Sequence, residues 1–460
     1  MIAFRISALA AGFSLFALCV SAARAAEGAP DPSDLPAGIQ AGAAAVEIEA
    51  DDAMVIAGGI GPGKASGQEG ALRATAVVLR DRHGTTLAIA ALDILMITRS
   101  ELDPVLEAVE KETGIPRSHI LVNCTHTHHA PSTLTVHGYG GDPVFTARVR
   151  QALRQALVDA HSQLEAGPCT FHFHLGREET VGQNSRQLLP DGSVYWIGPR
   201  DQFVRPTGPF DPELPVLAFR GADQALRALL FNHSTHTIGT LRPGVRSPSF
   251  YGLAAQELEE RLGGIVLFLE GASGSTHNLE LPCDLMKRRI MGAALEALEK
   301  SEARSVERIA SLKRPFRFRV RDFDEEQEDA AVSRYCRTWT GDYADDVIPV
   351  FRRMREVLRP QRGQERETWI QALRIGDVAI VGVPAEFFTK LGIDIKNRSP
   401  FRHTYIAELA NDWIGYLPDL DAHRLGGYQV WTGFHSYAEP GTGERMVDEA
   451  LELLKELEEL

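Results

Sequence analysis

Two short histidine-bearing segments carry the side chains best suited to chemistry in this chain of 460 residues, and together they hold five of its fifteen histidines. They read Thr125-His126-Thr127-His128-His129 and Asn232-His233-Ser234-Thr235-His236, and each follows an apolar run. Alternate residues of an extended backbone point to the same side, so His126 and His128 share a face. Imidazole nitrogens are the commonest protein ligands of zinc. The two segments therefore predict a metal site.

The elements that must position these histidines alternate between strands and helices. Apolar runs predict strands over residues 72–79, 86–97, 118–123, 169–175, 225–231 and 264–269. Helical spacing of apolar residues predicts helices over residues 100–113, 145–164 and 252–262. Such alternation favours an α/β fold, with mixed β-sheets flanked by helices and functional residues where strands pass into loops.

The N-terminal residues have the pattern of a secretory signal peptide. Arg5 precedes a nearly continuous apolar stretch over residues 6–20, and Ala23-Arg24-Ala25 offers a small-residue cleavage site. We interpret residues 1–25 as this signal, which predicts a periplasmic or secreted protein. No later stretch has the roughly 20 apolar residues that a transmembrane helix needs.

The net charge of −14 argues against nucleic acid and anionic lipid surfaces as main partners. The four later cysteines are Cys124, Cys169, Cys283 and Cys336, and their wide spacing matches neither a zinc ribbon nor a dense disulfide scaffold. A small molecule or lipid is the expected partner, and the oligomeric state stays open.

Neither a repeat nor a linker divides the rest of the chain. Residues 26–40 predict a loosely ordered lead-in rich in Pro, Asp and Ala, and residues 41–460 a single domain. The charged stretch over residues 319–366 is either a helical insertion or a boundary. Met446, Ala450, Leu453, Leu454 and Leu457 have the spacing of an amphipathic helix that closes the domain.

Five motifs, in order, resemble the neutral, non-lysosomal ceramidase family. They are Thr125-His126-Thr127-His128-His129-Ala130-Pro131, Gly208-Pro209-Phe210-Asp211-Pro212-Glu213, His233-Ser234-Thr235, Gly382-Val383-Pro384-Ala385-Glu386-Phe387-Phe388, and Asn411-Asp412-Trp413-Ile414-Gly415-Tyr416-Leu417-Pro418 followed by Gly426-Gly427-Tyr428. The match runs from about Ala41 to the C-terminus and covers the family's catalytic domain alone. Family members usually continue into an immunoglobulin-like domain.

The resemblance implies a site built on one zinc ion per chain. The implied ligands are His126, His233, Glu386 and Tyr416. The implied catalytic residues are His128 as a base or oxyanion partner, Arg186 as a contact to substrate, and Tyr416 as a donor to the oxyanion. A catalytic zinc needs about three protein ligands and an open position, and two His with one Glu is a known set.

One departure from the family concerns its catalytic serine. Where ceramidases carry Gly-Asp-x-Ser-Pro-Asn, this chain reads Gly271-Ala272-Ser273-Gly274-Ser275-Thr276-His277-Asn278. An ungapped match puts His277 at the place of the serine, and a shift by one puts Thr276 there. His277 is therefore a further candidate catalytic residue, and a zinc-bound water is the expected nucleophile.

Three functions remain open from the sequence. The first is a secreted zinc amidohydrolase that cleaves an N-acyl lipid resembling ceramide, or a similar small N-acyl compound. The second is a metal-dependent esterase or lactonase of the same fold, and the third a non-catalytic metal-binding envelope protein. His236 either belongs to the site or only lines its cavity, and Asp93 is a candidate to support a ligand histidine by a hydrogen bond.

Overall fold

The computed structural model describes residues 38–198, 200–278 and 281–460, and residues 36–460 form one compact unit. The expected signal peptide, residues 1–25, lies outside the described residues, as does the expected lead-in up to residue 37. Strand β1 (Ile39–Glu47) already includes the last two residues of that lead-in, because Ile39 and Gln40 pair with strand β5 (Pro168–Arg177).

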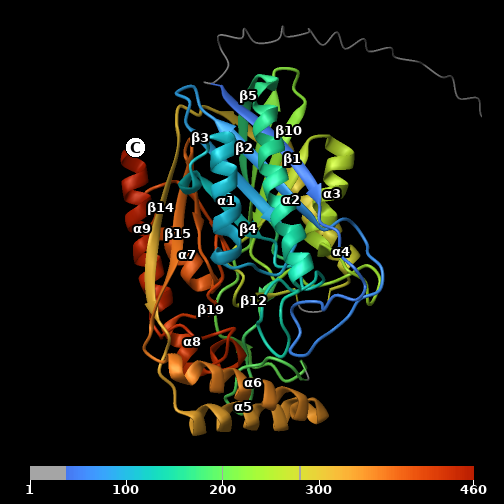
Figure 1. Ribbon diagram of the computed structural model, residues 1–460, viewed down its shortest axis with the longest axis vertical. Coiled ribbons are helices and arrows are strands. Elements are labelled where there is room, and N and C mark those ends of the chain that lie inside the picture. The colour runs from blue at the N-terminus through green and yellow to red at the C-terminus, as the bar shows by residue number, and fades with distance from the viewer. Residues whose placement is uncertain (1–37, 199, 279–280) are drawn as a thin grey trace, which may run out of the picture. The chain divides into compact units, whose positions relative to one another are not determined.

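A nine-stranded mixed sheet forms the first layer that positions the histidines (Figure 1). Its main path runs β11-β10-β9-β5-β1-β2-β3-β4, and β13 (Glu302–Arg304) pairs with β5. The remaining strands are β2 (Arg73–Arg80), β3 (Thr86–Leu92), β4 (Ile120–Cys124), β9 (Glu213–Gly221), β10 (Leu226–His233) and β11 (Ile265–Glu270). The pairs β3–β4 and β10–β11 are parallel, so β4 and β10 both end at the edge where the histidine segments begin.

A second sheet packs on the inner face of the first. It runs β14 (Ile309–Arg319), β15 (Glu365–Ile375), β16 (Val378–Gly382) and β18 (His403–Ala407). One buried cluster joins the sheets, with Ile89 and Leu121 from the first and Leu373 and Ile380 from the second. Burial of this apolar surface between two sheets is the main stabilising contribution that positions the site.

Helices cover the two outer faces and complete a four-layered arrangement. The outer face of the large sheet is covered by α1 (Arg99–Thr113), α2 (Pro143–Ser162), α3 (Ser249–Leu262) and α4 (Cys283–Glu299). The outer face of the smaller sheet is covered by α7 (Thr389–Arg398) and α9 (Thr442–Glu459). Met446, Leu453, Leu454 and Leu457 of α9 are fully buried, as the amphipathic spacing predicts. The α/β fold with mixed sheets flanked by helices is thereby confirmed.

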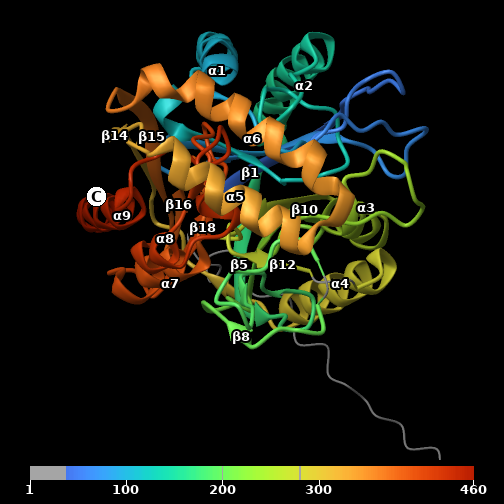
Figure 2. The ribbon, with the colours of Figure 1, turned by 90° about the horizontal axis from the view of Figure 1, so that it is seen from below.

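The charged stretch over residues 319–366 is a helical pair inserted between β14 and β15. Helices α5 (Glu325–Trp339) and α6 (Ala344–Leu358) lie side by side at the lower end of Figure 1 and across the front of Figure 2. Arg355 is fully buried between them and pairs with Glu325 and Asp329, each at 3.0 Å. Ion pairs between its own two helices therefore stabilise the insertion.

Short paired segments bring the remaining site residues to the strand ends. Strand β17 (Glu386–Phe387) pairs in parallel with β19 (Tyr416–Leu417), which sets Glu386 opposite Tyr416. Strand β12 (Thr276–His277) pairs with β6 (Gln183–Asn184). No described helix is both long and apolar enough to cross a bilayer. Among the described residues, all four cysteines are buried free thiols.

Candidate metal centre

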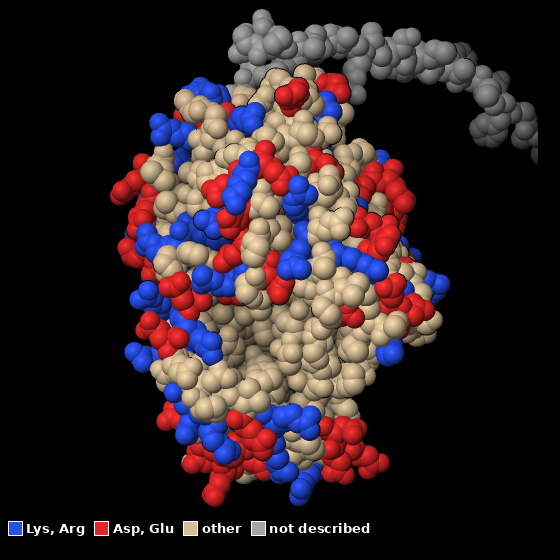
Figure 3. Space-filling view, in the orientation of Figure 1, with Lys and Arg blue, Asp and Glu red and all other residues tan. Residues whose placement is uncertain are grey.

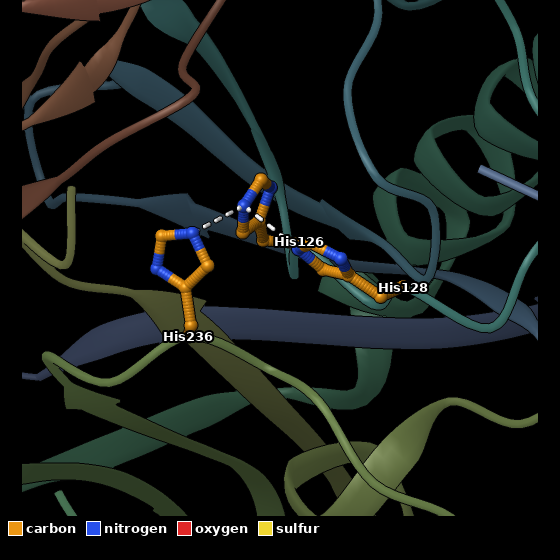
Figure 4. Close-up of side chains that lie close together, drawn as sticks. All are labelled: His126, His128 and His236. Atoms are coloured by element: carbon orange, nitrogen blue, oxygen red, sulfur yellow. Dashed lines mark hydrogen bonds between the residues drawn. The ribbon is translucent and has the colours of Figure 1, made fainter. Parts of the chain in front are cut away.

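Three imidazole rings from two distant segments converge at the ends of β4 and β10. His126, His128 and His236 point their rings toward one another (Figure 4), and one nitrogen from each lies within 4.8 Å of the others. Nε2 of His126 is 3.2 Å from Nε2 of His236 and 3.4 Å from Nε2 of His128. His126 and His236 are buried, and His128 is half-buried.

The hydrogen bonds at the far nitrogens fix where the protons on these rings lie. Nδ1 of His126 is 3.0 Å from the Leu95 carbonyl, and Nδ1 of His236 is 3.0 Å from the Ser273 carbonyl. A carbonyl only accepts, so each Nδ1 carries a proton, and in the tautomer with a single proton the Nε2 lone pair faces inward. Two facing lone pairs at 3.2 Å cannot hydrogen-bond to each other, so a cation bound between them would stabilise the arrangement.

A carboxylate and a phenol border the same point. Oε2 of Glu386 is 3.5 Å from Nε2 of both His126 and His236. The other carboxylate oxygen accepts from the Trp413 indole at 3.2 Å, which leaves Oε2 directed at the imidazoles. The hydroxyl of Tyr416 lies 3.3 Å from Nε2 of His236. Burial, together with the Glu386 carboxylate, raises the pKa of Tyr416 well above 10.

These separations fit the ligand set of a tetrahedral metal. Ligand atoms held about 2.0–2.2 Å from a tetrahedral zinc lie about 3.3–3.6 Å from one another. The three Nε2 and Oε2 separations from His126, of 3.2, 3.4 and 3.5 Å, and that of 3.5 Å between His236 and Glu386 match this spacing, and all three imidazole nitrogens lie within 4.8 Å of one another. Burial, and then the imidazoles of His126 and His236, lower the pKa of His128 well below 6.5, so its ring is neutral and able to bind a metal.

Local backbone geometry turns each ring inward. His126 has a φ of 61°, a left-handed conformation that non-glycine residues seldom adopt, directly after β4. Gly58 packs on His128 with a φ of 100°, and a Cβ there would lie 2.2 Å from Nδ1 of that ring. Positive φ and close approach both require glycine at position 58.

The structure does not bring His233 to this cluster. His233 is the last residue of β10. Its Nδ1 lies 2.5 Å from the Tyr251 hydroxyl, and its Nε2 lies 2.9 Å from the Glu178 carbonyl. Both ring nitrogens of His233 therefore have protein partners outside the cluster. The histidine that the structure places beside His126 is His236, three residues later, and His233 as a ligand stays a prediction.

The other expected catalytic residues lie at different distances from the imidazoles. His277 stacks on His236 with ring centroids 5.9 Å apart, and burial lowers its pKa to about 3. The guanidinium of Arg186 instead donates to Gln429 Oε1 at 2.9 Å and to the Gly426 carbonyl at 2.6 Å. Arg186 is fully buried, so its contacts are those of an anchor for residues 422–429.

Two buried carboxyl groups behind the cluster were missed by sequence reasoning. Glu408 accepts from the Ser273 hydroxyl at 2.7 Å, and Glu270 accepts from the Thr237 hydroxyl at 2.7 Å. Burial raises the pKa of both well above 4.5. The backbone carbonyl of Ser273 in turn accepts a hydrogen bond from Nδ1 of His236, so Glu408 supports that ring through Ser273. Glu270 is the last residue of the apolar strand β11 and Glu408 directly follows the apolar strand β18, which was the available signal.

A cavity of about 330 Å³ reaches the cluster beside His128 and His129. Residues 56–65, which include four glycines, form one wall, and Thr240, Gly244 and Val245 form another. A second cavity, of about 240 Å³, separates residues 135–140 from α6. Figure 3 shows this face of the molecule hollowed above α5 and α6 and mostly uncharged there.

Solved ceramidases share this fold. The neutral ceramidase from Pseudomonas aeruginosa superposes with a TM-score of 0.68 at 18% sequence identity, over 93% of this chain and 75% of that chain. A ceramidase complexed with C2 gives a TM-score of 0.67 at 16% identity, over 93% and 76% of the two chains. No protein-family model and no curated protein sequence matches the chain. The resemblance read from the motifs is thus confirmed at the level of the fold.

Proposed function

We propose that this protein is a zinc-dependent amidohydrolase that cleaves the amide bond of an N-acyl compound. The observation that carries the proposal is the convergence of unprotonated Nε2 atoms of His126 and His236 with a carboxylate oxygen of Glu386. The cluster offers three imidazole nitrogens and one carboxylate oxygen. Imidazole nitrogens are borderline-soft donors that suit zinc, whereas magnesium and calcium prefer oxygen ligands. One ion per chain follows from one such group among the described residues.

Each residue around the cluster has a role that its contacts support. A zinc ion held by these four side chains would supply the nucleophile if a water joined them as a fifth ligand, since zinc would lower the pKa of that water to near 7. Tyr416 stays protonated at neutral pH, since its pKa is well above 10, and its hydroxyl is placed to donate to a developing oxyanion. His277 is neutral at that pH and stacks beside His236, so its ring can contact a substrate as an uncharged hydrogen-bonding group.

The cavity beside the imidazoles favours a small substrate. Its volume of about 330 Å³ is near the lower end of the range for drug-sized ligands, and glycines and small side chains form much of its wall, with Ile56 and Val245 as the larger apolar ones. A short N-acyl compound suits this space better than a long-chain lipid does. The same observation supports an ester or lactone as the second candidate substrate. We further propose that the protein acts in the periplasm or outside the cell, on the evidence of residues 1–25.

A hydrolysis screen tests the proposal. Purified protein is assayed on N-acyl sphingoid bases of short and long chain, N-acyl amino acids and simple esters, each with and without a chelator. We expect chelator-sensitive release of a carboxylic acid from a short N-acyl substrate and its loss in His236→Ala. His172→Ala, on the half-exposed face of β5, is the matched control and retains activity. Turnover that is indifferent to chelation and to His236→Ala would contradict the proposal.

A further inference from the structure

A cavity of about 510 Å³ lies apart from the imidazoles, between α5 and the segment that begins with α8 (Leu420–Leu425). Residues 191–194 and 423–431 form two of its walls, and the exposed face of α5 forms the third. Both helices are at the lower end of Figure 1. None of the residues of the candidate metal centre lines this cavity, so it has to be explained separately.

A buried guanidinium lines this space without a counter-ion. Arg321 is 6% exposed, and its Nη2 donates to the Ser436 carbonyl at 2.5 Å. Its Nε has no hydrogen-bond acceptor. Among the described residues, no carboxylate lies within ion-pair distance of the Arg321 guanidinium. Burial lowers the pKa of Arg321 to about 10, and the charge of Glu328 opposes that shift. A buried cation with an unused donor is costly unless an anion completes it.

The other charged groups of the cavity limit the charge of such an anion. Arg334 on α5 also makes no ion pair within the described chain, and His423 adds a neutral ring, since burial lowers its pKa to about 4. Two carboxylates oppose them. Glu328 accepts from the Thr432 backbone at 3.0 Å, and Asp191 accepts from Ser193. With two cations and two anions around the space, a ligand with a single negative charge is favoured over a dianion.

Part of the remaining wall is apolar. Tyr335 and Trp431 contact each other edge to face at 5.4 Å, and Leu425, Val430 and Val194 also line the cavity, together with the polar side chains of Gln327 and Thr338. A planar guanidinium donates two parallel hydrogen bonds to a carboxylate. Aromatic and aliphatic walls, in turn, favour a ligand with an apolar body.

We propose that this cavity is a second ligand site, which binds an amphiphilic monocarboxylate with its head group on Arg321 and its apolar body against Tyr335 and Trp431. The proposal does not depend on the metal centre or on the reaction there. Octanoate is the probe, octanamide is its uncharged match, and inorganic phosphate tests the charge limit. Binding to the full chain is measured by calorimetry in the presence of a chelator, so that a carboxylate cannot bind through the metal.

We expect octanoate to bind and octanamide and phosphate to bind at least about tenfold more weakly, as the loss of a charge-assisted hydrogen bond implies. Arg321→Gln should weaken octanoate binding by about tenfold or more. Arg334→Gln should do so by a smaller factor, while Arg337→Gln, on the same helix but outside the cavity, leaves it unchanged. Ala331→Trp fills the cavity without touching the buried arginine and should abolish binding.

Three results would overturn the site. They are absence of octanoate binding, binding that survives Ala331→Trp, and binding that is lost in His236→Ala but kept in Arg334→Gln and Ala331→Trp. Tighter binding of phosphate than of octanoate would overturn the ligand class. Because Arg334 and Ala331 are exposed on α5, these two variants keep the test decisive even if Arg321→Gln destabilises the fold.

Discussion

Replacing His236 and His233 separately by alanine distinguishes the ligand set of the structure from the one that the sequence motif implies. His236 directs Nε2 at His126, 3.2 Å away, whereas both nitrogens of His233 bond elsewhere, to Tyr251 and Glu178. The two substitutions remove the same side chain, three residues apart in one segment. They should nevertheless affect different properties.

The magnitudes follow from these contacts. Zinc held by four protein ligands contributes about 10–16 kcal/mol, so one ligand is worth about 2.5–4 kcal/mol, or about two to three orders of magnitude in affinity. His236→Ala should therefore weaken zinc binding by about that factor. His233→Ala leaves the buried Tyr251 hydroxyl without its partner and opens a cavity, at a cost of about 3 kcal/mol or more of unfolding free energy. Its zinc affinity should change less than about tenfold, in the range of an indirect support.

Competition for zinc with a chromophoric chelator gives the affinities, and urea denaturation of the metal-free variants gives the stabilities. A large loss of affinity in His236→Ala with nearly native stability, and the reverse in His233→Ala, is the expected pattern. If His233→Ala lost zinc by two orders of magnitude while its metal-free form unfolded like the native chain, the assignment of His236 would be refuted.

Three further predictions follow from the same contacts. Gly58→Ala should displace the His128 ring and weaken zinc binding by about tenfold or more, whereas Gly61→Ala, whose Cβ meets nothing within 4 Å, should leave it unchanged when both are titrated with zinc. Glu386→Gln should lower zinc affinity by about two orders of magnitude with a smaller effect on thermal stability, and equal affinities would exclude a carboxylate ligand. Burial raises the pKa of Asp93 to about 6 from 3.8, so the protonated form stabilises the fold below about pH 4 and that stabilisation is lost as pH rises through 6. Relative to Asp93→Asn, urea denaturation of metal-free protein should show the native chain losing about 3 kcal/mol between pH 4 and pH 7, and parallel curves would count against this shift.

The elements around the site could be predicted because their signals are local. The strands that end at residues 124 and 233 and the helices 99–113 and 249–262 follow directly from apolar runs and helical spacing. The strand expected over residues 86–97 ends at Leu92 instead, because Asp93 turns to accept from the Arg73 backbone at 3.0 Å. That contact joins residues 20 apart, which no local pattern reveals.

The choice between His233 and His236 could not be made from the sequence. Both follow one apolar run, and the deciding contacts come from Ser273, Tyr251 and Glu178, which are distant in the chain. By contrast, Glu386 and Tyr416 could be singled out because each belongs to a long and specific motif, and the structure places Glu386 beside His126 and Tyr416 beside His236. The helical insertion was visible as a charged stretch, but the cavity that it forms with residues 423–431 was not, since it depends on how two distant segments pack.

Anomalous diffraction at the zinc absorption edge, from crystals of the purified protein, tests the central claim most directly. The account predicts one strong peak per chain, about 2.0–2.2 Å from Nε2 of His126, His128 and His236 and from Oε2 of Glu386. A fully zinc-loaded crystal with no peak among these atoms, or with its peak at His233, would contradict it.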